Sequence, residues 1–593
     1  MRLRLIRLRF RRRVRKGQQQ VEGLGSKTEE RLNRHFVKRL GNLTHVRRFV
    51  VSWVLLVVLL IGGLFIQNLS LSNYFQTLRP VPGGIYNEGI LGTFTNANPM
   101  YATNNVDTSV SKLLFAGLFT YNGRNQLVGD LASGYSVDAS ESVYTVHLKP
   151  HLTWQDGQPL TSADVVFTYQ AIQNPDAQSP LRSSWQSITV SAPNPQTVVF
   201  KLPGTLASFP YTMTNGIVPK HILGNVPAAG LRSVDFNTVH PVGAGPFAWQ
   251  AIQVAGNDPS VAQEQIALVP FAGYNRGEPK LREFIVHAYA SQADLIQAFK
   301  SGQLTGAAGL TSVPPDVKNM PSLEVHSPLL TAATMVFFKT SSGMLSDVHV
   351  RQAVTEGTNR QAIIKSLGYS THAVREPLLM GQLGYDPALA QAGFDPVAAR
   401  QLLDSDGWAV GKNGLRSKNG QTLSFNLTAA DTAEYRLVAQ QLKQQWRNLG
   451  VQLNVQLQDS TDFHNSLTYH NYDAVLYGIS IGSDPDVFVY WDSSQADVRS
   501  ANRLNLSEYK NTTADSALDA GRSRSQPQLR IIKYRPFLQA WQQDYPALGL
   551  YQPRFLYLTN GAVAGLSDHA INSPTGRFND VQSWEIRDAK VTD

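Results

Sequence analysis

The chain has 593 residues, 42% of them hydrophobic, and no cysteine. This length is enough for two or more lobes, and the lack of cysteine excludes disulfides, thiolate metal sites and a cysteine nucleophile. The net charge of +9 arises in residues 1–48, which hold 16 basic and 3 acidic residues, whereas the rest of the chain holds 37 basic and 41 acidic residues. The basic tail could bind RNA or anionic lipid. We favour a solvated determinant of membrane topology and expect no nucleic-acid partner.

An uncharged apolar run extends from Phe49 to Ile66. With Gln67 it approaches the roughly 20 residues that a helix needs to span a bilayer. A cleavable signal peptide is the alternative, but its apolar region usually has about 7–15 residues followed by small residues. The basic residues before the run predict a cytoplasmic tail (1–48), a retained single-pass anchor (49–67), and an ectodomain outside the cell membrane, extracellular or periplasmic.

A linker is expected over residues 68–84, which end in RPVPGG, with the folded domain beginning near Ile85. The segment 109–119 then has apolar residues at helical spacing, including Val110, Leu114 and Leu118. These positions predict a helix that reaches past Gly117.

Residues 144–172 predict a strand, a turn and a helix in that order. Tyr144–Leu152 alternates apolar and polar residues. Asp156-Gly157 is a turn pair because glycine adopts positive φ without steric cost. Thr161 can cap a helix, with Asp164 as the acidic half of a capping box.

Further elements follow the same mixed pattern, so the fold class is α/β. They are helices over 291–304 and 347–367 (capped by Asp347), a helix from 433 that stops at Gly450 before a strand up to 458, and a strand within 471–482.

We find no HExxH, G-x-S-x-G or P-loop motif. The glycines at 243 and 245 are followed by Pro246 rather than by a helix, which argues against a phosphate loop. His464 and His470 are interpreted as surface or hydrogen-bonded histidines. We therefore expect no catalytic residues, no metal and no cofactor, and keep a surface enzyme only as the least favoured alternative.

Seven stretches in order resemble the family 5 extracellular solute-binding proteins, which are the oligopeptide-, dipeptide- and nickel-binding components of ABC importers. The resemblance covers about residues 85–560. The most specific stretches are LLFAGLFTYN, LVGDLASGYSVDASESVYTVHLKPHLTWQDGQPLTSADVVFTYQAI, PVGAGPF and YDAVLYGISIGSDPDVF.

The resemblance implies a periplasmic-binding-protein clamshell of two α/β lobes joined by two hinge strands. We expect lobe I over 85–278 with a return over 557–593, and lobe II over 279–556. The implied function is capture of oligopeptides or a similar elongated solute by hinge closure, with delivery to an ABC permease and its ATPase subunits. The ectodomain is expected to be monomeric. An alternative is a sensor, or a binder of a sugar or a metal chelate.

The resemblance also implies a ligand site. In peptide-binding relatives the strand matching Tyr477–Ser480 pairs with the ligand backbone, and Gly478 is expected to leave room for that approach. The carboxylate that holds the ligand ammonium in relatives is replaced here by Ile481. The arginine that precedes the long helix in dipeptide-binding relatives is also missing, which argues against a short zwitterionic peptide. We expect ligand contacts from Tyr477, Gly478, Ile479, Ser480, Asp484, Asp486, Tyr490, Trp491, Tyr101 and Thr103.

Alternatives exist at four of these positions. Asp484 and Asp486 can instead form a strand-ending turn, and Tyr490 and Trp491 can instead belong to the core of the lobe.

Overall fold

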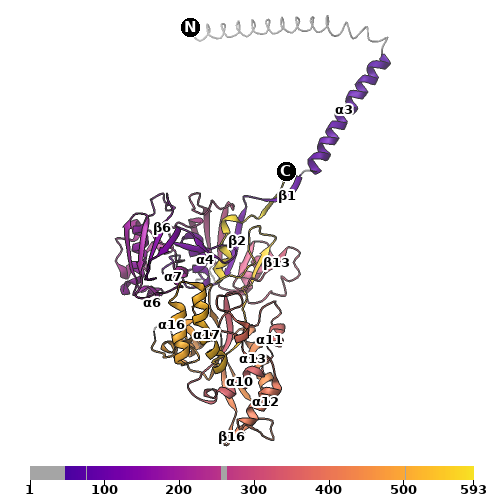
Figure 1. Ribbon diagram of the computed structural model, residues 1–593. Coiled ribbons are helices and arrows are strands. Elements are labelled where there is room, and N and C mark those ends of the chain that lie inside the picture. Colours follow the sequence, from indigo (N-terminus) through magenta and orange to yellow (C-terminus); the bar gives the residue numbers. More distant parts are fainter. Residues whose placement is uncertain (1–46, 75, 256–262, 501–502, 593) are drawn as a thin grey trace. The chain divides into compact units, whose positions relative to one another are not determined.

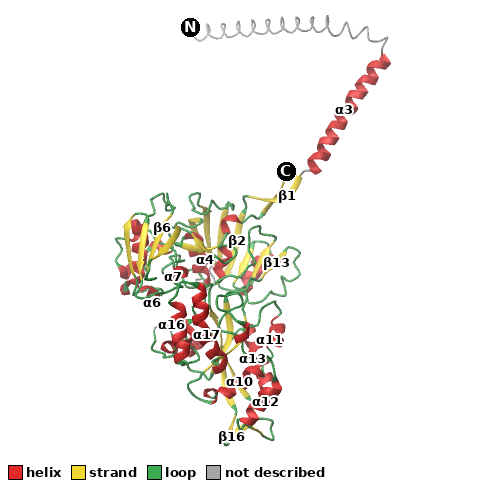
Figure 2. Cartoon of the chain, viewed as in Figure 1, coloured by secondary structure: helices red, strands yellow, loops and turns green. Residues whose placement is uncertain are grey.

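The computed structural model describes residues 47–74, 76–255, 263–500 and 503–592. The chain divides into two compact units, one formed by residues 80–587 and the other by residues 1–79 with 588–593. Figure 1 colours the chain by residue number from the N-terminus to the C-terminus, and Figure 2 shows helices and strands mixed throughout the larger unit. The expected α/β class is confirmed.

The smaller unit contains helix α3 (Arg47–Tyr74). Within it, Phe49–Gln67 has a mean hydropathy of 2.9 and no buried residue, so this helix is long and apolar enough to cross a membrane. The helix continues into the expected linker, where residues 68–74 contain neither proline nor glycine. Strand β1 (Gln76–Val81) follows and pairs with β23 (Arg587–Thr592). Irregular backbone between β1 and the next strand, which begins at Ile85, is confined to residues 82–84.

The larger unit contains a mixed seven-stranded sheet in the order β13-β22-β12-β2-β11-β10-β9. Strand β2 lies near its centre and runs parallel to both β11 and β12. The strands are β2 (Ile85–Leu91), β9 (Phe247–Ala255), β10 (Gln263–Pro270), β11 (Glu283–Tyr289), β12 (Gly306–Ala308), β13 (Leu323–His326) and β22 (Tyr557–Asn560). Helix α9 (Gln292–Lys300), capped by Ser291, packs against this sheet.

The strand expected at the start of residues 144–172 belongs to a four-stranded sheet, and the expected turn and helix follow it in the chain. The order of this sheet is β5-β6-β8-β7, formed by β5 (Ala132–Val137), β6 (Val143–Leu148), β8 (Thr197–Lys201) and β7 (Thr189–Asn194). Gly157 has a φ of +85°. Helix α5 (Ser162–Gln173) begins with the predicted capping box, in which Asp164 accepts from the Thr161 backbone. These local predictions are confirmed.

Helix α4 (Asn105–Leu114) ends earlier than the apolar spacing predicted. The Leu114 carbonyl accepts hydrogen bonds from the Gly245 N–H and from the Gln155 side chain, so it is not available to a further helical turn. A Cβ on Gly243 would stand 1.9 Å from the same carbonyl oxygen. The glycines of PVGAGPF therefore allow one backbone segment to approach the end of α4 closely.

A second, five-stranded sheet has the order β19-β18-β20-β14-β21. All seven residues of β14 (Ala332–Phe338) are buried, and alternate residues contribute to two separate hydrophobic cores on its two faces. A sheet that is covered on both faces explains these continuous apolar strands. The other strands are β18 (Ser424–Ala430), β19 (Gln452–Gln458), β20 (Ala474–Ser480) and β21 (Ala547–Tyr551).

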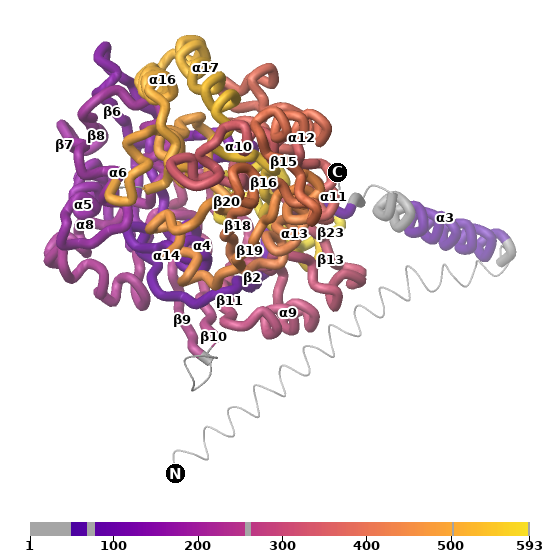
Figure 3. Tube along the Cα trace, turned by 90° about the horizontal axis from the view of Figure 1, so that it is seen from below, coloured from indigo at the N-terminus to yellow at the C-terminus, as the bar shows by residue number. Residues whose placement is uncertain are grey.

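Helices cover both faces of the five-stranded sheet. Figures 1 and 3 both show α16 and α17 side by side. The helices are α10 (Val348–Glu356), α11 (Arg360–Leu367), α12 (Pro396–Ser405), α13 (Ala433–Arg447), α14 (Ser460–Tyr469), α16 (Thr512–Arg522) and α17 (Pro527–Asp544). The single helix expected over 347–367 is two helices, because Gly357 packs against Leu449 and Asn359 caps a new start.

Two segments connect the seven-stranded and five-stranded sheets, residues 327–331 and 552–556. They run antiparallel side by side, with Leu330 N–H donating to the Pro553 carbonyl and Phe555 N–H to the Pro328 carbonyl. Strands β11, β12 and β13 belong to the first sheet although they lie in the range expected for lobe II. The division between the sheets therefore does not fall at residues 278/279, where the sequence placed the lobe boundary.

Candidate ligand-binding cleft

Strand β20 has one open edge where the expected ligand strand lies. It pairs with β14 along its whole length, from Ala474 to Ser480. On its other side it pairs with β18 only through Ala474–Leu476. Residues Tyr477–Ser480 therefore have a partner strand on one side only, and the other edge can accept an extended ligand.

Two tyrosine hydroxyls cover this open edge. The Tyr490 hydroxyl donates to the Ser480 carbonyl oxygen over 2.6 Å, and the Gly478 backbone hydrogen-bonds to the Tyr435 hydroxyl. Burial raises the pKa of Tyr490 to about 12 and also raises that of Tyr435, so both phenols are neutral. Gly478 and Ser480 thus carry backbone groups that point away from β14.

A cavity of about 270 Å³, here called the hinge cavity, lies beside the two connecting segments. It is lined by the start of α4, the start of α13 and the connections, through residues that include Asn105, Leu330, Glu434, Tyr435, Arg554 and Arg577. Glu434 accepts from the Tyr551 hydroxyl over 2.8 Å and from the Tyr369 hydroxyl over 3.3 Å. Arg577 is already paired with the buried Glu88 over 2.9 Å.

A second cavity of about 400 Å³ is here called the loop cavity. It lies between the half of the larger unit that contains the seven-stranded sheet and the half that contains the five-stranded sheet. One wall is the loop after β20, and the opposite wall comes from α4, β3 (Phe119–Tyr121) and the chain around 572. Its lining includes Lys112, Tyr121, Asn125, Ile481, Asp484 and Asn572. Ile481 is buried, and its backbone N–H donates to the Thr331 carbonyl over 2.9 Å.

The two aspartates of the DPD turn also line the loop cavity, but both already have arginine partners. Asp484 receives two hydrogen bonds of 2.7 Å from Arg530, and the side chains are 7% and 6% exposed. Asp486 pairs with Arg522 over 3.1 Å. The Asp486 N–H donates to the Asp484 carboxylate over 3.0 Å, as in an Asx turn.

The remaining expected site residues lie in different surroundings. Trp491 is fully buried, stacks on Phe337 and meets Trp541 edge-on, so it is part of the core of the five-stranded half. Tyr101 is buried and donates to the Ala177 carbonyl over 3.0 Å. Thr103 is exposed. Neither Tyr101 nor Thr103 lines the hinge or the loop cavity.

Direct contacts join the two halves beside the cleft. The Glu141 carboxylate accepts from the Ser525 backbone N–H over 2.9 Å and from its hydroxyl over 2.5 Å. The Ser208 hydroxyl donates to Asp486 over 2.8 Å. These bonds connect the four-stranded sheet and its neighbouring loops with the α16–α17 region, so opening of the halves would break them.

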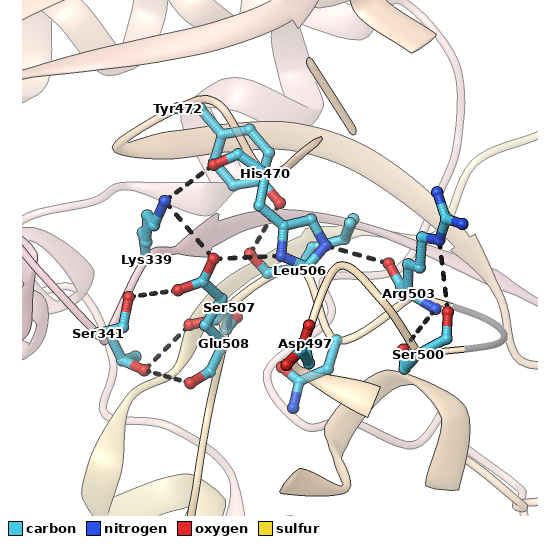
Figure 4. A network of polar contacts seen from close by, with 12 residues as sticks. Lys339, Ser341, His470, Tyr472, Asp497, Ser500, Arg503, Leu506, Ser507 and Glu508 are labelled. Carbon is cyan, nitrogen blue, oxygen red and sulfur yellow. Dashed lines mark hydrogen bonds and ion pairs between the residues drawn. The ribbon is translucent and has the colours of Figure 1, made fainter. Parts of the chain in front are cut away.

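His470 belongs to a network of polar contacts outside the cavities (Figure 4). Its side chain is fully buried at the end of α14 and lies between the Glu508 carboxylate, 3.3 Å away, and the Arg503 carbonyl, 3.1 Å away. Lys339 lies 3.5 Å from the same carboxylate. The interpretation of His470 as a hydrogen-bonded histidine is therefore confirmed. His464 is exposed.

Lys112, Asn125, Asn572, Tyr435 and Glu434 line the cavities but were not expected there. Lys112 had one signal in the sequence, because it is a charged residue within the apolar stretch SVSKLLF. The others lie in loops or at a helix start, where polar residues are ordinary.

Comparison with known proteins gives the same fold and identifies a family. A family model described as bacterial extracellular solute-binding proteins, family 5 middle, matches residues 126–500. The oligopeptide-binding protein AppA of Bacillus subtilis is 24% identical over 531 residues, covering 86% of this chain and 94% of its own. The probable D,D-dipeptide-binding periplasmic protein DdpA of Escherichia coli is 23% identical over 79% of this chain and 88% of its own.

Solved structures are also similar. AppA of Bacillus subtilis in complex with a nonapeptide has a TM-score of 0.68 at 22% identity, covering 86% of this chain and 100% of that one. NikZ of Campylobacter jejuni in complex with Ni(L-His) has a TM-score of 0.71 at 23% identity, covering 85% and 99%. The fold is thus the two-lobed one of these binding proteins, with the lobes built around the two large sheets. The chain belongs to the bacterial extracellular solute-binding proteins of family 5.

Proposed function

We propose that this protein is the membrane-tethered substrate-binding component of an ABC importer, and that it captures oligopeptides or a similar elongated solute. The observation that carries this proposal is the open edge of β20 at Tyr477–Ser480, because Tyr435 at this edge lines the hinge cavity and Ile481 directly after it lines the loop cavity. Backbone groups on such an edge bind a peptide of any sequence, because every peptide offers the same N–H and C=O groups.

Binding at this edge requires two side chains to move. The Tyr490 and Tyr435 hydroxyls cover the groups that a ligand strand would use. Both are side-chain contacts, so rotation exposes the edge without unfolding a strand. The lobes then close over the ligand through the paired connections, and the closed form passes it to a permease.

The loop after β20 does not present an unpaired carboxylate to the amino terminus of a ligand in the loop cavity, among the residues that the structure describes. Ile481 has no charge, and Asp484 and Asp486 are each paired with an arginine. An ammonium group that entered the loop cavity would have to displace one of these arginines. We therefore expect ligands that bind through backbone and shape, with the amino terminus contributing little.

Native mass spectrometry of the full-length chain in detergent micelles tests this proposal. The probe is an equimolar mixture of random-sequence pentapeptides, offered with free and with acetylated amino termini. We expect retention of many sequences, with acetylated forms weakened by less than about tenfold, which is the loss for one hydrogen bond to a charged group. Retention of no peptide would contradict peptide capture, and a larger loss on acetylation would reveal an ammonium anchor.

The anchor is tested separately. Phe49–Gln67 supports a retained span by length and composition. Amino-terminal sequencing of the protein extracted from membranes should find the chain beginning before residue 49. A mature terminus between residues 70 and 85 would instead identify the helix as a cleaved signal sequence.

A further inference from the structure

Lys112 places a positive charge on the wall of the loop cavity. It lies on α4, and its ammonium group donates to the Thr120 hydroxyl over 2.7 Å. Among the described residues no carboxylate oxygen lies within 4.0 Å of it. Burial lowers its pKa, and attraction to Asp130 only partly offsets that effect. A charge in such a place is costly unless a counter-charge arrives.

The acidic groups near Lys112 do not neutralise all the positive charge in this region. Its neighbours in this region are the bases Lys149 and Arg276 and the acids Asp130 and Asp580. Arg276 takes Asp580 as its ion-pair partner over 2.7 Å. Three bases thus share two carboxylates, which leaves one excess positive charge, and Lys112 is the base of this group that lines the cavity.

Asn572 supplies a second donor to the same cavity. Its Oδ1 atom accepts from the side chains of Asn125, Ser483 and Thr331 over 3.0, 3.0 and 2.6 Å. These bonds orient the amide, and its buried Nδ2 atom has no partner among the described residues. The Asn125 Oδ1 atom is likewise buried without a partner. Buried polar atoms of this kind are normally satisfied, so a ligand or solvent has to complete them.

The acids of the cavity do not compete for Lys112. Asp484 and Asp486 are held by Arg530 and Arg522. The residues that line the cavity therefore include a cation and two asparagines, whose Nδ2 (Asn572) and Oδ1 (Asn125) atoms have no partner among the described residues. A carboxylate with an N–H nearby matches this set, because the carboxylate accepts from the two donors and the N–H donates to Asn125.

We propose that the loop cavity is a carboxylate subsite, in which Lys112 and the Asn572 amide bind an acidic group of the ligand and Asn125 accepts a neighbouring N–H. This inference deepens the proposed function, on which it rests, by assigning the ligand class as carboxylate-bearing. The acidic group is either the free carboxyl terminus of a peptide or an acidic side chain, since both present the same chemistry.

Three pentapeptide mixtures distinguish these sources: free acids without Asp or Glu, their carboxyl-terminal amides, and amides that contain one Glu. Each is offered to the full-length chain in micelles and quantified by native mass spectrometry. We expect the free acids, the Glu-containing amides or both to be retained at least about tenfold more than the acid-free amides. Equal retention of all three mixtures overturns the inference and leaves peptide capture standing.

Matched variants test the residue assignment. Lys112→Met removes the cavity charge, whereas Lys149→Met removes a charge from the same group but not from the cavity lining. We expect Lys112→Met to abolish the preference for acids and Lys149→Met to keep it. An equal effect of both variants overturns the subsite, because it shows a general field. Asn572→Leu should also reduce the preference, which provides a second readout if Lys112→Met does not fold.

Failure of peptide capture remains distinguishable from failure of the subsite. If wild-type protein retains no peptide at all, thermal unfolding in sodium N-acetylalaninate, against N-acetylalanine amide, measures the carboxylate alone. A rise in the unfolding midpoint with the carboxylate in wild type, absent in Lys112→Met, supports the subsite without peptide capture. No difference between the two probes overturns it.

Discussion

Replacing Asp484 by Asn separates a structural role of this residue from a ligand-binding one. The substitution keeps the shape of the side chain and removes its charge. The Arg530 guanidinium then lies 6% exposed without its counter-ion. Burial alone would lower the pKa of Arg530, but the hydrogen bonds and the charge of Asp484 more than offset this and raise it, so the arginine stays charged.

The magnitude follows from the burial of the pair. Removing one partner of a buried ion pair costs about 3–5 kcal/mol, because the other charge remains in a poorly solvated place. Arg530 keeps hydrogen bonds to the Gly521 carbonyl and to the Tyr534 hydroxyl. The loss of unfolding free energy should therefore lie near the lower end of that range. Asp486→Asn is the matched control. Arg522 is 24% exposed, so its pair is closer to the surface value of about 1 kcal/mol or less.

Urea unfolding of the larger unit, followed by tryptophan fluorescence, measures both variants within the full-length chain. We expect Asp484→Asn to lower the unfolding free energy by about 3 kcal/mol and Asp486→Asn by much less. The double variant Asp484→Asn/Arg530→Met should recover most of the loss, because no isolated charge remains. Unchanged stability in Asp484→Asn together with lost peptide binding would refute this reasoning and make Asp484 a ligand contact.

Three further substitutions have defined outcomes. Gly478→Val should weaken pentapeptide retention about tenfold with little change in unfolding midpoint. The new Cβ would meet only the ends of two side chains, the Tyr435 hydroxyl at 3.3 Å and the Thr334 hydroxyl at 3.9 Å. A large stability loss would contradict this. Glu141→Ala removes the hydrogen bonds that Ser525 donates to the Glu141 carboxylate, whereas Glu141→Gln keeps an oxygen that can accept one of them. The Ala variant should therefore release ligand several-fold faster than the Gln variant. An unchanged release rate would show that these contacts do not hold the closed form. Burial raises the pKa of Glu376 from 4.5 to about 7. The folded protein therefore binds more protons than the unfolded chain between these pH values, so stability should fall by about 3 kcal/mol as pH rises through that window. Glu376→Gln should flatten this slope in thermal unfolding scans, and an equal slope in the variant would assign it to other groups.

Local sequence signals predicted the elements that depend on a few neighbouring residues. The Thr161 capping box, the turn at Gly157 and the cap at Asp347 all form as expected, because each is completed by atoms within a few residues. The apolar run from Phe49 predicted a helix for the same reason. Where a distant segment intervened, local spacing failed: α4 stops at Leu114 because Gly245 takes its carbonyl.

Periodicity and ordered motifs were enough to predict the α/β class, the family and the strand around Gly478. Which charged side chains around the cavities have an ion-pair partner depends on contacts between segments that are distant in the chain. Asp484 finds Arg530 from 46 positions away, and Asn125 meets Asn572 from 447 positions away. Neither partner can be read from a local pattern. Whether a charged side chain serves stability or a ligand depends on the burial and pairing that folding creates. Asp484 is ion-paired with Arg530, whereas Lys112 has no carboxylate within 4.0 Å in the part of the chain that the structure describes.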